Sequence, residues 1–312
     1  MQRKPIILIT GAGGRAGTRL ANTLLENDFG KVVGVGHKEC DLIHRNTVYE
    51  LIAAWKPDYI FHLAAQSSIP FSWQDPLHTM NNNVMPAVHL FEAIRHYKLA
   101  TRVLLAGSSE EYGLVYPEEL PIRENNALRP LNPYGVSKVA MDLLGWQYFK
   151  NYGLPILRAR SFNNLGADPN KPDVANDWIH QIARMEKGLG EPILKVGNLE
   201  SKRDFVDIED VVAAYWLILT QGDAGEVYNI ASGSPISMQV LLDEILQLTS
   251  IKVKIVQDAS KLRPSDVPIH CGDFSKLKVK TGWGPRKSLR ESLKRMFDFW
   301  RKQVILTLHP LK

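Results

Sequence analysis

The fold is decided by residues 6–17, IILITGAGGRAG. Four apolar residues in succession, ended by a glycine, are typical of a buried parallel strand. Gly11, Gly14 and Gly17 then have G-x-x-G-x-x-G spacing, and apolar residues at helical spacing begin directly afterwards, at 19–26. Glycines between a strand and a helix allow a tight turn whose N–H groups can meet a pyrophosphate. Residues 11–17 are therefore predicted to form a dinucleotide-binding loop.

The alternation of strand and helix continues outward from this loop. Further apolar runs that indicate strands lie at 32–35, 59–63, 102–106 and 156–160, and helical stretches lie at 47–55, 76–97 and 134–151. Strands that alternate with helices favour a parallel sheet with right-handed crossovers. The first half thus predicts an α/β fold, a doubly wound parallel sheet of Rossmann type.

The pattern of the sequence changes after residue 161. Shorter segments follow, with helix-like stretches at 174–187, 207–221 and 236–249, strand-like stretches at 192–196, 226–230 and 252–256, and an amphipathic helix at 289–303. We interpret 1–160 as the NAD(P)-binding domain, to which 205–232 returns. Residues 161–204 and 233–312 are expected to form a smaller C-terminal α/β domain that binds the substrate.

Composition excludes several classes of protein. The chain has 312 residues, of which 45% are hydrophobic and 23% charged, and these values are typical of globular proteins. The net charge of +5 comes without a basic run interleaved with aromatic residues, so we expect no nucleic-acid partner. No apolar run is long enough to span a bilayer, and two cysteines give no disulfide framework. We expect a soluble, cytoplasmic protein without a bound metal.

The residue after the second strand should decide the choice of cofactor. An acidic residue there would bind the ribose 2′-hydroxyl of NAD, but the chain has Gly36, His37 and Lys38. Lys38 could pair with a 2′-phosphate, which favours NADP(H), while NAD(H) stays possible. Asp41 could accept from the adenine amino group or could simply be an exposed loop acid. The predicted cofactor contacts are Gly11, Gly14, Arg15, Ala16, Gly17, His37, Lys38, Asp41, Leu42, Leu63, Ala64, Ala65, Tyr134 and Lys138.

A catalytic constellation follows the fourth strand. Tyr134 and Lys138 are four residues apart, so on a helix they share one face. A nearby ammonium is expected to lower the pKa of the phenol and to make it a general acid or base. Ser108, at the end of the strand, is a candidate to bind the reacting oxygen. Glu110 could abstract a proton next to a ketone or could bind a sugar hydroxyl.

These motifs resemble the extended short-chain dehydrogenase/reductase family of nucleotide-sugar enzymes. The resemblance is carried by the glycine loop, by His62-Leu63-Ala64-Ala65, by 108–113 and by Asn132-Pro133-Tyr134-Gly135-Val136-Ser137-Lys138. Residues 196–205 and 262–265 are most similar to the GDP-mannose branch. The resemblance implies that Arg203 and Arg263 bind a GDP diphosphate, that Phe162 lies at the cofactor, and that the chain is a homodimer through helices 76–97 and 134–151. The substrate contacts it implies are Gln66, Ser67, Ser108, Ser109, Asn163, Asn198, Arg203 and Arg263.

Within that branch the chain is more similar to the reductases than to the dehydratases. Dehydratases typically have a longer insertion after the second strand, and Gln66-Ser67-Ser68 with Ser72-Trp73 resembles the reductases' substrate loop. One departure is the loop 164–169, where relatives tend to have a histidine and a Gly-Pro-Gly-Gln turn. This loop is expected near the nicotinamide and the sugar, so the stereochemistry at C4 is left open.

The hypothesis from sequence is reduction by NADPH of the C4 ketone of GDP-4-keto-6-deoxy-D-mannose. The expected product is GDP-D-rhamnose or its C4 epimer. Two alternatives stay open. One is a GDP-mannose 4,6-dehydratase or another nucleotide-sugar epimerase or dehydratase, and the other is a non-catalytic protein that senses a dinucleotide.

Overall fold

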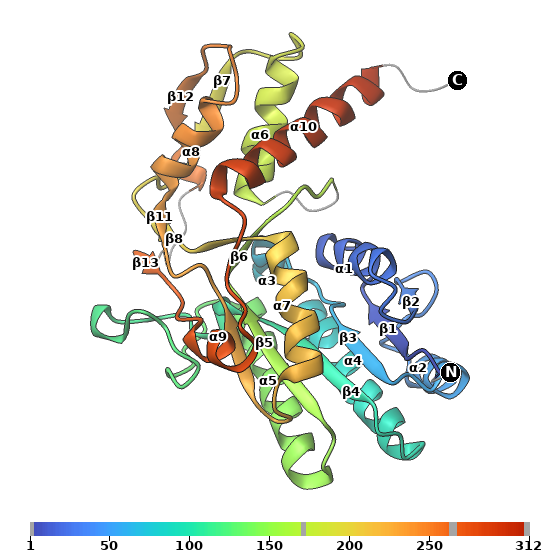
Figure 1. Ribbon diagram of the computed structural model, residues 1–312. Coiled ribbons are helices and arrows are strands. Elements are labelled where there is room, and N and C mark those ends of the chain that lie inside the picture. The colour runs from blue at the N-terminus through green and yellow to red at the C-terminus, as the bar shows by residue number, and fades with distance from the viewer. Residues whose placement is uncertain (1–2, 170–172, 262–266, 309–312) are drawn as a thin grey trace.

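The computed structural model describes residues 3–169, 173–261 and 267–308 (Figure 1). Its largest element is a six-stranded sheet in which every neighbouring pair is parallel. The strands, in spatial order, are β10 (Val227–Ile230), β5 (Ile156–Ser161), β4 (Arg102–Ser108), β3 (Tyr59–His62), β1 (Ile6–Thr10) and β2 (Lys31–Val35). The order reverses between β1 and β3, and ligands of open α/β sheets bind at the carboxyl ends of the strands at such a point.

The strands are apolar without alternation because both faces of the sheet are buried. Ile7 and Ile9 of β1 belong to the core on one face, and Leu8 between them belongs to the core on the other. In β3, Phe61 belongs to the same core as Ile7 and Ile9, and Ile60 belongs to the same core as Leu8. This pattern is the one expected of a parallel sheet covered by helices on both sides.

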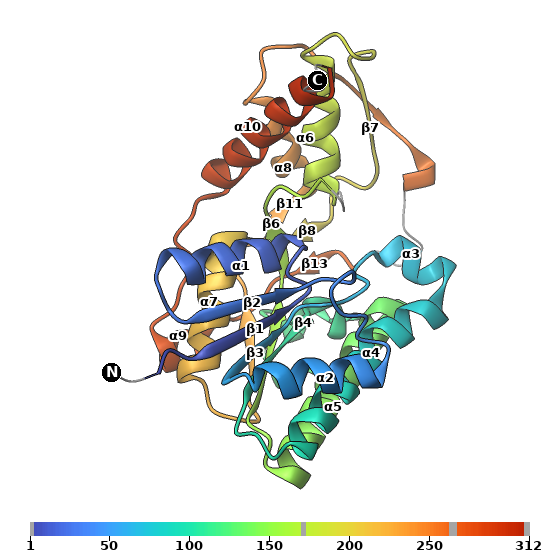
Figure 2. The ribbon, with the colours of Figure 1, turned by 90° about the vertical axis from the view of Figure 1, so that its right-hand side faces the viewer.

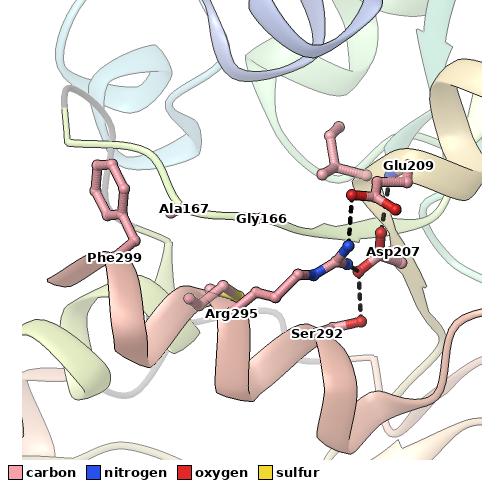
Figure 3. A pocket seen from close by; sticks show the side chains of 9 residues that line it. Gly166, Ala167, Asp207, Glu209, Ser292, Arg295 and Phe299 are labelled. Carbon is pink, nitrogen blue, oxygen red and sulfur yellow. Dashed lines mark hydrogen bonds and ion pairs between the residues drawn. The ribbon is translucent and has the colours of Figure 1, made fainter. Parts of the chain in front are cut away.

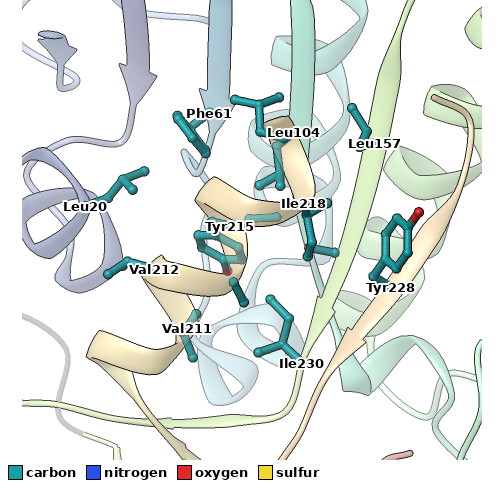
Figure 4. Packing of buried hydrophobic residues seen from close by; sticks show 14 of the residues in the cluster. Leu20, Phe61, Leu104, Leu157, Val211, Val212, Tyr215, Ile218, Tyr228 and Ile230 are labelled. Atoms are coloured by element: carbon teal, nitrogen blue, oxygen red, sulfur yellow. The ribbon is translucent and has the colours of Figure 1, made fainter. Parts of the chain in front are cut away.

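Two layers of helices cover the sheet. One contains α1 (Arg15–Glu26), α7 (Ile208–Gln221) and α9 (Ser275–Thr281), and the other contains α2 (Arg45–Trp55), α4 (Pro76–His96) and α5 (Pro133–Tyr152). Figure 2 shows α1 and α7 on one side of the sheet and α2, α4 and α5 on the other. Val212, Tyr215 and Ile218 of α7 pack toward the sheet residues Phe61 and Leu104 (Figure 4). The predicted doubly wound α/β fold is confirmed.

A third hydrophobic core lies beyond the carboxyl ends of the strands. It is built by α6 (Val174–Met185), α8 (Met238–Leu246), α10 (Leu289–Leu308) and the parallel pair β7 (Ile193–Val196) and β12 (Lys254–Gln257). Short strands connect it to the main sheet: β6 (Asn163–Leu165) with β9 (Phe205–Asp207), and β8 (Lys202–Arg203) between β11 (Ile236–Ser237) and β13 (Ile269–His270). The elements of this core lie above the sheet in Figure 1.

The remaining short helices are α3 (Ile69–Gln74), η1 (Ser109–Glu111), η2 (Pro117–Glu119) and η3 (Ala259–Lys261). Within the described ranges, no helix combines the length and the apolar character that crossing a membrane requires. The boundaries proposed for the two domains stay a prediction, although β10, which lies within 205–232, pairs with β5 at the edge of the main sheet.

Candidate active site

The glycine loop joins β1 to α1 in a turn that leaves no space for side chains at two positions. Gly11 has a φ of +72°, and a Cβ there would lie 2.7 Å from the backbone nitrogen of Ala64. A Cβ at Gly17 would lie 2.2 Å from the carbonyl oxygen of Gly11. A Cβ at Gly13 would meet nothing within 4 Å, so the outer side of the loop is open. An open loop at a helix N-terminus fits a dinucleotide's diphosphate.

Arg15, predicted to contact the cofactor, also contacts residues on both sides of the segment 170–172, which is not described. Its Nη2 lies 2.6 Å from the Asp173 carboxylate, its Nε lies 3.7 Å from Asp168, and its Nη1 donates to the carbonyl oxygen of Asn164 at 2.9 Å. Gly166 packs against it, since a Cβ there would lie 3.2 Å from Arg15 Cδ. The first turn of α1 is thereby connected to the loop whose sequence departs from the family pattern. Ala16, next to Arg15, is half-buried in the same turn.

Both basic and acidic side chains follow the end of β2. His37 and Lys38 are exposed, as expected for residues that could meet a phosphate. Asp41 lies between two histidines, 3.9 Å from His37 Nδ1 and 3.6 Å from His44 Nε2, and Leu42 beside it is buried. The carboxylate of Glu39, which the sequence interpretation overlooked, accepts a hydrogen bond from the Gly36 N–H at 2.8 Å. The carboxylate of Glu39 is therefore bonded to Gly36, the residue that follows the second strand.

The end of β3 is fixed by an asparagine from α4. The backbone N–H of Gln66 donates to Asn83 Oδ1 at 2.7 Å, and Asn83 Nδ2 donates to the Gln66 carbonyl at 3.0 Å and to Ser137 Oγ at 2.8 Å. Asn83 is fully buried and thus connects the predicted substrate loop to α5. Leu63, Ala64 and Ala65 are half-buried at this strand end, and Ser67 is exposed.

The structure brings Ser108, Tyr134 and Lys138 together. Ser108 ends β4, and its side chain lies next to the Tyr134 phenol, whose pKa it lowers. Lys138 lies one helical turn further along α5, with its Nζ 5.8 Å from the centre of the Tyr134 ring. The ammonium donates to the main-chain carbonyl oxygen of Ala106 at 2.7 Å. Ser109, next to Ser108, is buried and begins the short helix η1.

The expected effect of Lys138 on the Tyr134 phenol was wrong. Burial raises the pKa of Tyr134 above its ordinary value, the neighbouring Ser108 side chain opposes this rise, and the carboxylates of Glu110 and Glu111 add to it. Because an apolar surrounding disfavours a phenolate, desolvation outweighs the helical neighbour that the sequence pointed to. The phenol therefore keeps its proton at neutral pH.

Glu110 is held in place by the cap of α5. Asn132 Nδ2 donates to Glu110 Oε2 at 2.8 Å, while Asn132 Oδ1 accepts from the Gly135 N–H at 2.8 Å and caps the helix. The loop before Tyr134 thus orients the one carboxylate that was predicted to act beside Ser108. The sequence signal for Asn132 was its place before the proline that begins the helix.

The predicted substrate residues lie on several different segments. Asn163 Nδ2 donates to the Asp204 carbonyl at 3.1 Å, and Arg203 Nη1 donates to the Val267 carbonyl at 2.7 Å. Asn198 accepts from the Glu200 N–H at 2.9 Å. Phe162, which was predicted at the cofactor, is buried, and its ring centre lies 5.3 Å from that of His270. These contacts bring Asn163 close to the segment of Arg203. Arg263 lies outside the described residues.

A small hollow lies on the α10 side of the loop 165–167, with a volume of about 210 Å³. Figure 3 shows Arg295 reaching from α10 toward Asp207 and Glu209 at the start of α7. Ser292 donates to Asp207 at 2.5 Å. The contacts fasten α10 to α7 and contain no group of the predicted site. Across the described ranges, no cluster of side chains is suited to hold a metal ion.

The sequence of the chain is similar to those of several known proteins. Residues 35–296 match the family model described as GDP-mannose 4,6 dehydratase. The chain is 32% identical to the GDP-6-deoxy-D-mannose reductase of Pseudomonas aeruginosa, covering 96% of this chain and 98% of that protein. It is 28% identical to the GDP-mannose 4,6-dehydratase of Yersinia enterocolitica, covering 91% and 90%.

Solved structures give the same relationship. The structure of RMD from Pseudomonas aeruginosa complexed with NADPH superimposes with a TM-score of 0.88 at 30% identity, covering 96% of this chain and 99% of that one. The family match spans most of the chain, and the fold, the glycine loop and the serine, tyrosine and lysine at one strand end accompany it. The chain therefore belongs to the extended short-chain dehydrogenase/reductase family, among its NAD(P)-dependent nucleotide-sugar epimerases, dehydratases and reductases.

Proposed function

We propose that the protein reduces the C4 ketone of GDP-4-keto-6-deoxy-D-mannose with NADPH and forms a GDP-6-deoxyhexose, GDP-D-rhamnose in the first instance. The observation that carries the proposal is the meeting of Ser108, Tyr134 and Lys138 at the end of β4, where the Lys138 ammonium is bonded to the Ala106 carbonyl. Identity to the P. aeruginosa reductase, at 32%, exceeds the 28% identity to the Yersinia dehydratase and supports the choice of reaction.

The chain's residues divide the chemistry among them. A reduced nicotinamide supplies the hydride when the cofactor is bound. Ser108 and Tyr134 hydrogen-bond the ketone oxygen, and Tyr134 gives its proton to that oxygen as negative charge develops there. A phenol that stays protonated at neutral pH is the form this step needs. Lys138 fixes α5 against β4 through its bond to the Ala106 carbonyl and contacts the cofactor's ribose.

The open glycine loop and the end of β2 are proposed to hold NADP(H), with NAD(H) as the second possibility. The N–H groups of the glycine loop would hold the diphosphate, and Lys38 and His37 would hold the 2′-phosphate. The Glu39 carboxylate lies at the same strand end and disfavours that phosphate. Preference between the two dinucleotides thus depends on neighbouring charges of opposite sign.

The GDP-sugar is proposed to lie between the main sheet and the C-terminal core. Arg203 and Arg263 bind its diphosphate, because guanidinium groups match phosphate oxygens in pairs. Asn163, Asn198, Gln66 and Ser67 supply hydrogen bonds to the sugar and the nucleotide.

A second candidate reaction is the 4,6-dehydration of GDP-mannose. The hydrogen bond from Asn132 to Glu110 favours it, because it orients a carboxylate beside Ser108, where a base could remove a proton next to the ketone. In a reductase the same carboxylate binds a sugar hydroxyl. The dehydratase recycles its cofactor within one turnover and consumes no added NADPH.

The test follows nicotinamide absorbance with purified protein, NADPH and GDP-4-keto-6-deoxy-D-mannose. Consumption of NADPH with formation of a reduced GDP-sugar supports the reductase, and NMR of the product gives the configuration at C4. Conversion of GDP-mannose to the keto sugar without added reductant would replace the proposal by the dehydratase. Tyr134→Phe is the control and should lower turnover by a factor of about 100 to 10,000 while NADPH still binds.

We also propose that two copies of the chain pair through α4 and α5. Val136, Leu143 and Trp146 are exposed apolar residues on α5, and Met85 is exposed on α4. Tyr148, on the same helix, is buried in the protein's own core. Light scattering after size exclusion should give a dimer, and Trp146→Glu should give a monomer. Val279→Glu, which changes an exposed residue of α9, should leave the dimer intact.

A further inference from the structure

A chain of buried charges lies directly beneath the strand end that carries Ser108. Glu111 is fully buried, Arg160 of β5 is 3% exposed and Asp142 of α5 is 1% exposed. Glu111 Oε2 accepts from Arg160 Nε at 2.8 Å, and Arg160 Nη2 lies 3.2 Å from Asp142. Asp142 also accepts from Arg158 at 2.5 Å. This row of buried charges thus links η1, β5 and α5.

The other oxygen of the Glu111 carboxylate contacts the backbone of the proposed catalytic serine. Glu111 Oε1 accepts from the Ser108 N–H at 2.8 Å, and Ser108 Oγ accepts from the Glu110 N–H at 3.2 Å. Together these bonds form a capping box around η1. The Ser108 backbone is thereby fixed from below, while its hydroxyl stays next to Tyr134.

Space for the carboxylate comes from a glycine. A Cβ at Gly107 would lie 2.4 Å from Glu111 Oε1 and 2.9 Å from the carbonyl oxygen of Ala159. A side chain there would displace either the carboxylate or the neighbouring strand. Gly107, Ser108 and Glu111 therefore form one arrangement in which the carboxylate reaches the strand end.

This arrangement is costly for the folded protein. Burial raises the pKa of Glu111 above its ordinary value, Asp142 adds to the rise, and Arg160 opposes it. Apolar residues in place of a buried ion pair are often neutral or stabilising. A role beyond stability would account for an acid at this position.

We propose that Glu111 is a positioning residue, which holds the Ser108 backbone N–H and so sets the serine hydroxyl at the distance from Tyr134 that the reaction requires. The catalytic part of this inference rests on the function proposed above for Ser108 and Tyr134. Arg160 acts through Glu111, because it holds the carboxylate that holds the serine. Displacement of a reacting group by about 1 Å can lower a rate by about a hundredfold.

Three variants separate positioning from stability. Glu111→Leu removes the acceptor for the Ser108 N–H. Glu111→Gln keeps one acceptor oxygen for the Ser108 N–H and places its amide NH2 group against Arg160. Asp142→Asn is the matched control, since it changes a buried acid on the same arginine without contact to Ser108. Circular dichroism and thermal denaturation report folding, and the glutamine variant serves if the leucine variant does not fold.

Two measurements are made on each variant. Amide hydrogen exchange at Ser108 should become at least about tenfold faster in Glu111→Leu and should stay near wild type in Asp142→Asn. kcat should fall by about tenfold to a hundredfold in Glu111→Leu and by less in Glu111→Gln, with KM for the sugar and Kd for NADPH within about twofold of wild type.

The outcomes are distinguishable from failure of the proposed function. Turnover is measured on whichever of GDP-mannose and the keto sugar the wild-type protein converts, and the exchange measurement needs no substrate. Unchanged exchange at Ser108 in both Glu111 variants would overturn the proposal. An equal loss of kcat in Asp142→Asn at equal stability would also overturn it, because the effect would then follow stability alone.

Discussion

Lys138 donates a hydrogen bond from its ammonium to the main-chain carbonyl oxygen of Ala106, at a distance of 2.7 Å. Lys138 belongs to α5, which carries Tyr134, and Ala106 belongs to β4, which ends in Ser108. The bond therefore ties the helix of the proposed proton donor to the strand that ends in Ser108. The lysine is 3% exposed, so this contact forms away from bulk water.

Replacing Lys138 by methionine should affect both turnover and stability. We expect kcat to fall by about a hundredfold, because the ammonium no longer orders α5 and the ribose. The free energy of unfolding should fall by about 1–3 kcal/mol, because the buried Ala106 carbonyl loses its donor. Lys150→Met, an exposed change near the end of the same helix, is the control for kinetics and denaturation. Turnover near wild type in Lys138→Met would contradict the role given to this residue.

The pH dependence of ketone reduction should follow the protonated form of Tyr134. Burial raises the phenol's pKa above its ordinary value, and the acid form is the one that donates the proton. A raised pKa keeps this form populated as the pH increases, so kcat should stay on a plateau from neutral pH and fall only above about pH 10. Steady-state kinetics across this range, with stability checked at each pH, measure it. A loss of kcat with a midpoint near pH 8 would show that another group or a lower phenol pKa governs the step.

Cofactor preference should change in opposite directions when the two charges after β2 are removed. Lys38→Ala should weaken NADPH binding by about tenfold and leave NADH binding almost unchanged, because only NADPH carries the 2′-phosphate. Glu39→Gln should strengthen NADPH binding, because it removes a negative charge that lies 2.8 Å from the Gly36 N–H. Fluorescence titration of both dinucleotides gives the dissociation constants, with Lys254→Ala as a distant control. Equal effects on NADH and NADPH would place the 2′-phosphate elsewhere.

Two glycines of the loop should respond differently to alanine. At Gly17 a Cβ would lie 2.2 Å from the Gly11 carbonyl oxygen, so Gly17→Ala should lower the free energy of unfolding by about 1–3 kcal/mol. At Gly13 a Cβ meets nothing within 4 Å, so Gly13→Ala should stay within about 0.5 kcal/mol of wild type. Chemical denaturation of the two variants makes the comparison. Equal destabilisation would contradict the packing of α1 against the loop.

The main sheet could be predicted because its signals are local. The first four residues of Ile6–Thr10 are apolar, and the glycines that follow mark the turn into α1. The two-residue strands were missed for a physical reason. Lys202–Arg203 contains no apolar pattern and forms a strand only because β11 and β13 lie beside it. Such pairing depends on segments far apart in the sequence.

The candidate site was predictable to a similar degree. The carboxyl ends of parallel strands meet at one edge of a sheet, so the strand predictions alone are enough to place Ser108 and the glycine loop at the same edge. The hydrogen-bond partners of the site residues could not be predicted from the sequence. Asn83, Asn132 and Glu111 make their contacts only through tertiary packing. The pKa of Tyr134 was misjudged for the same reason, since burial does not show in a four-residue spacing.

The pairing of β10 with β5 decides how the chain can be divided. A fragment that ends at residue 160 would lack β10 and α7, and β5 would become an unpaired edge with its inward apolar face uncovered. Unprotected edges of this kind recruit other strands and aggregate. An engineered dinucleotide-binding fragment would therefore need residues 205–232 fused back onto it, for instance through a short linker after residue 161. We therefore predict that a part of this protein able to fold alone would combine two separate stretches of the chain.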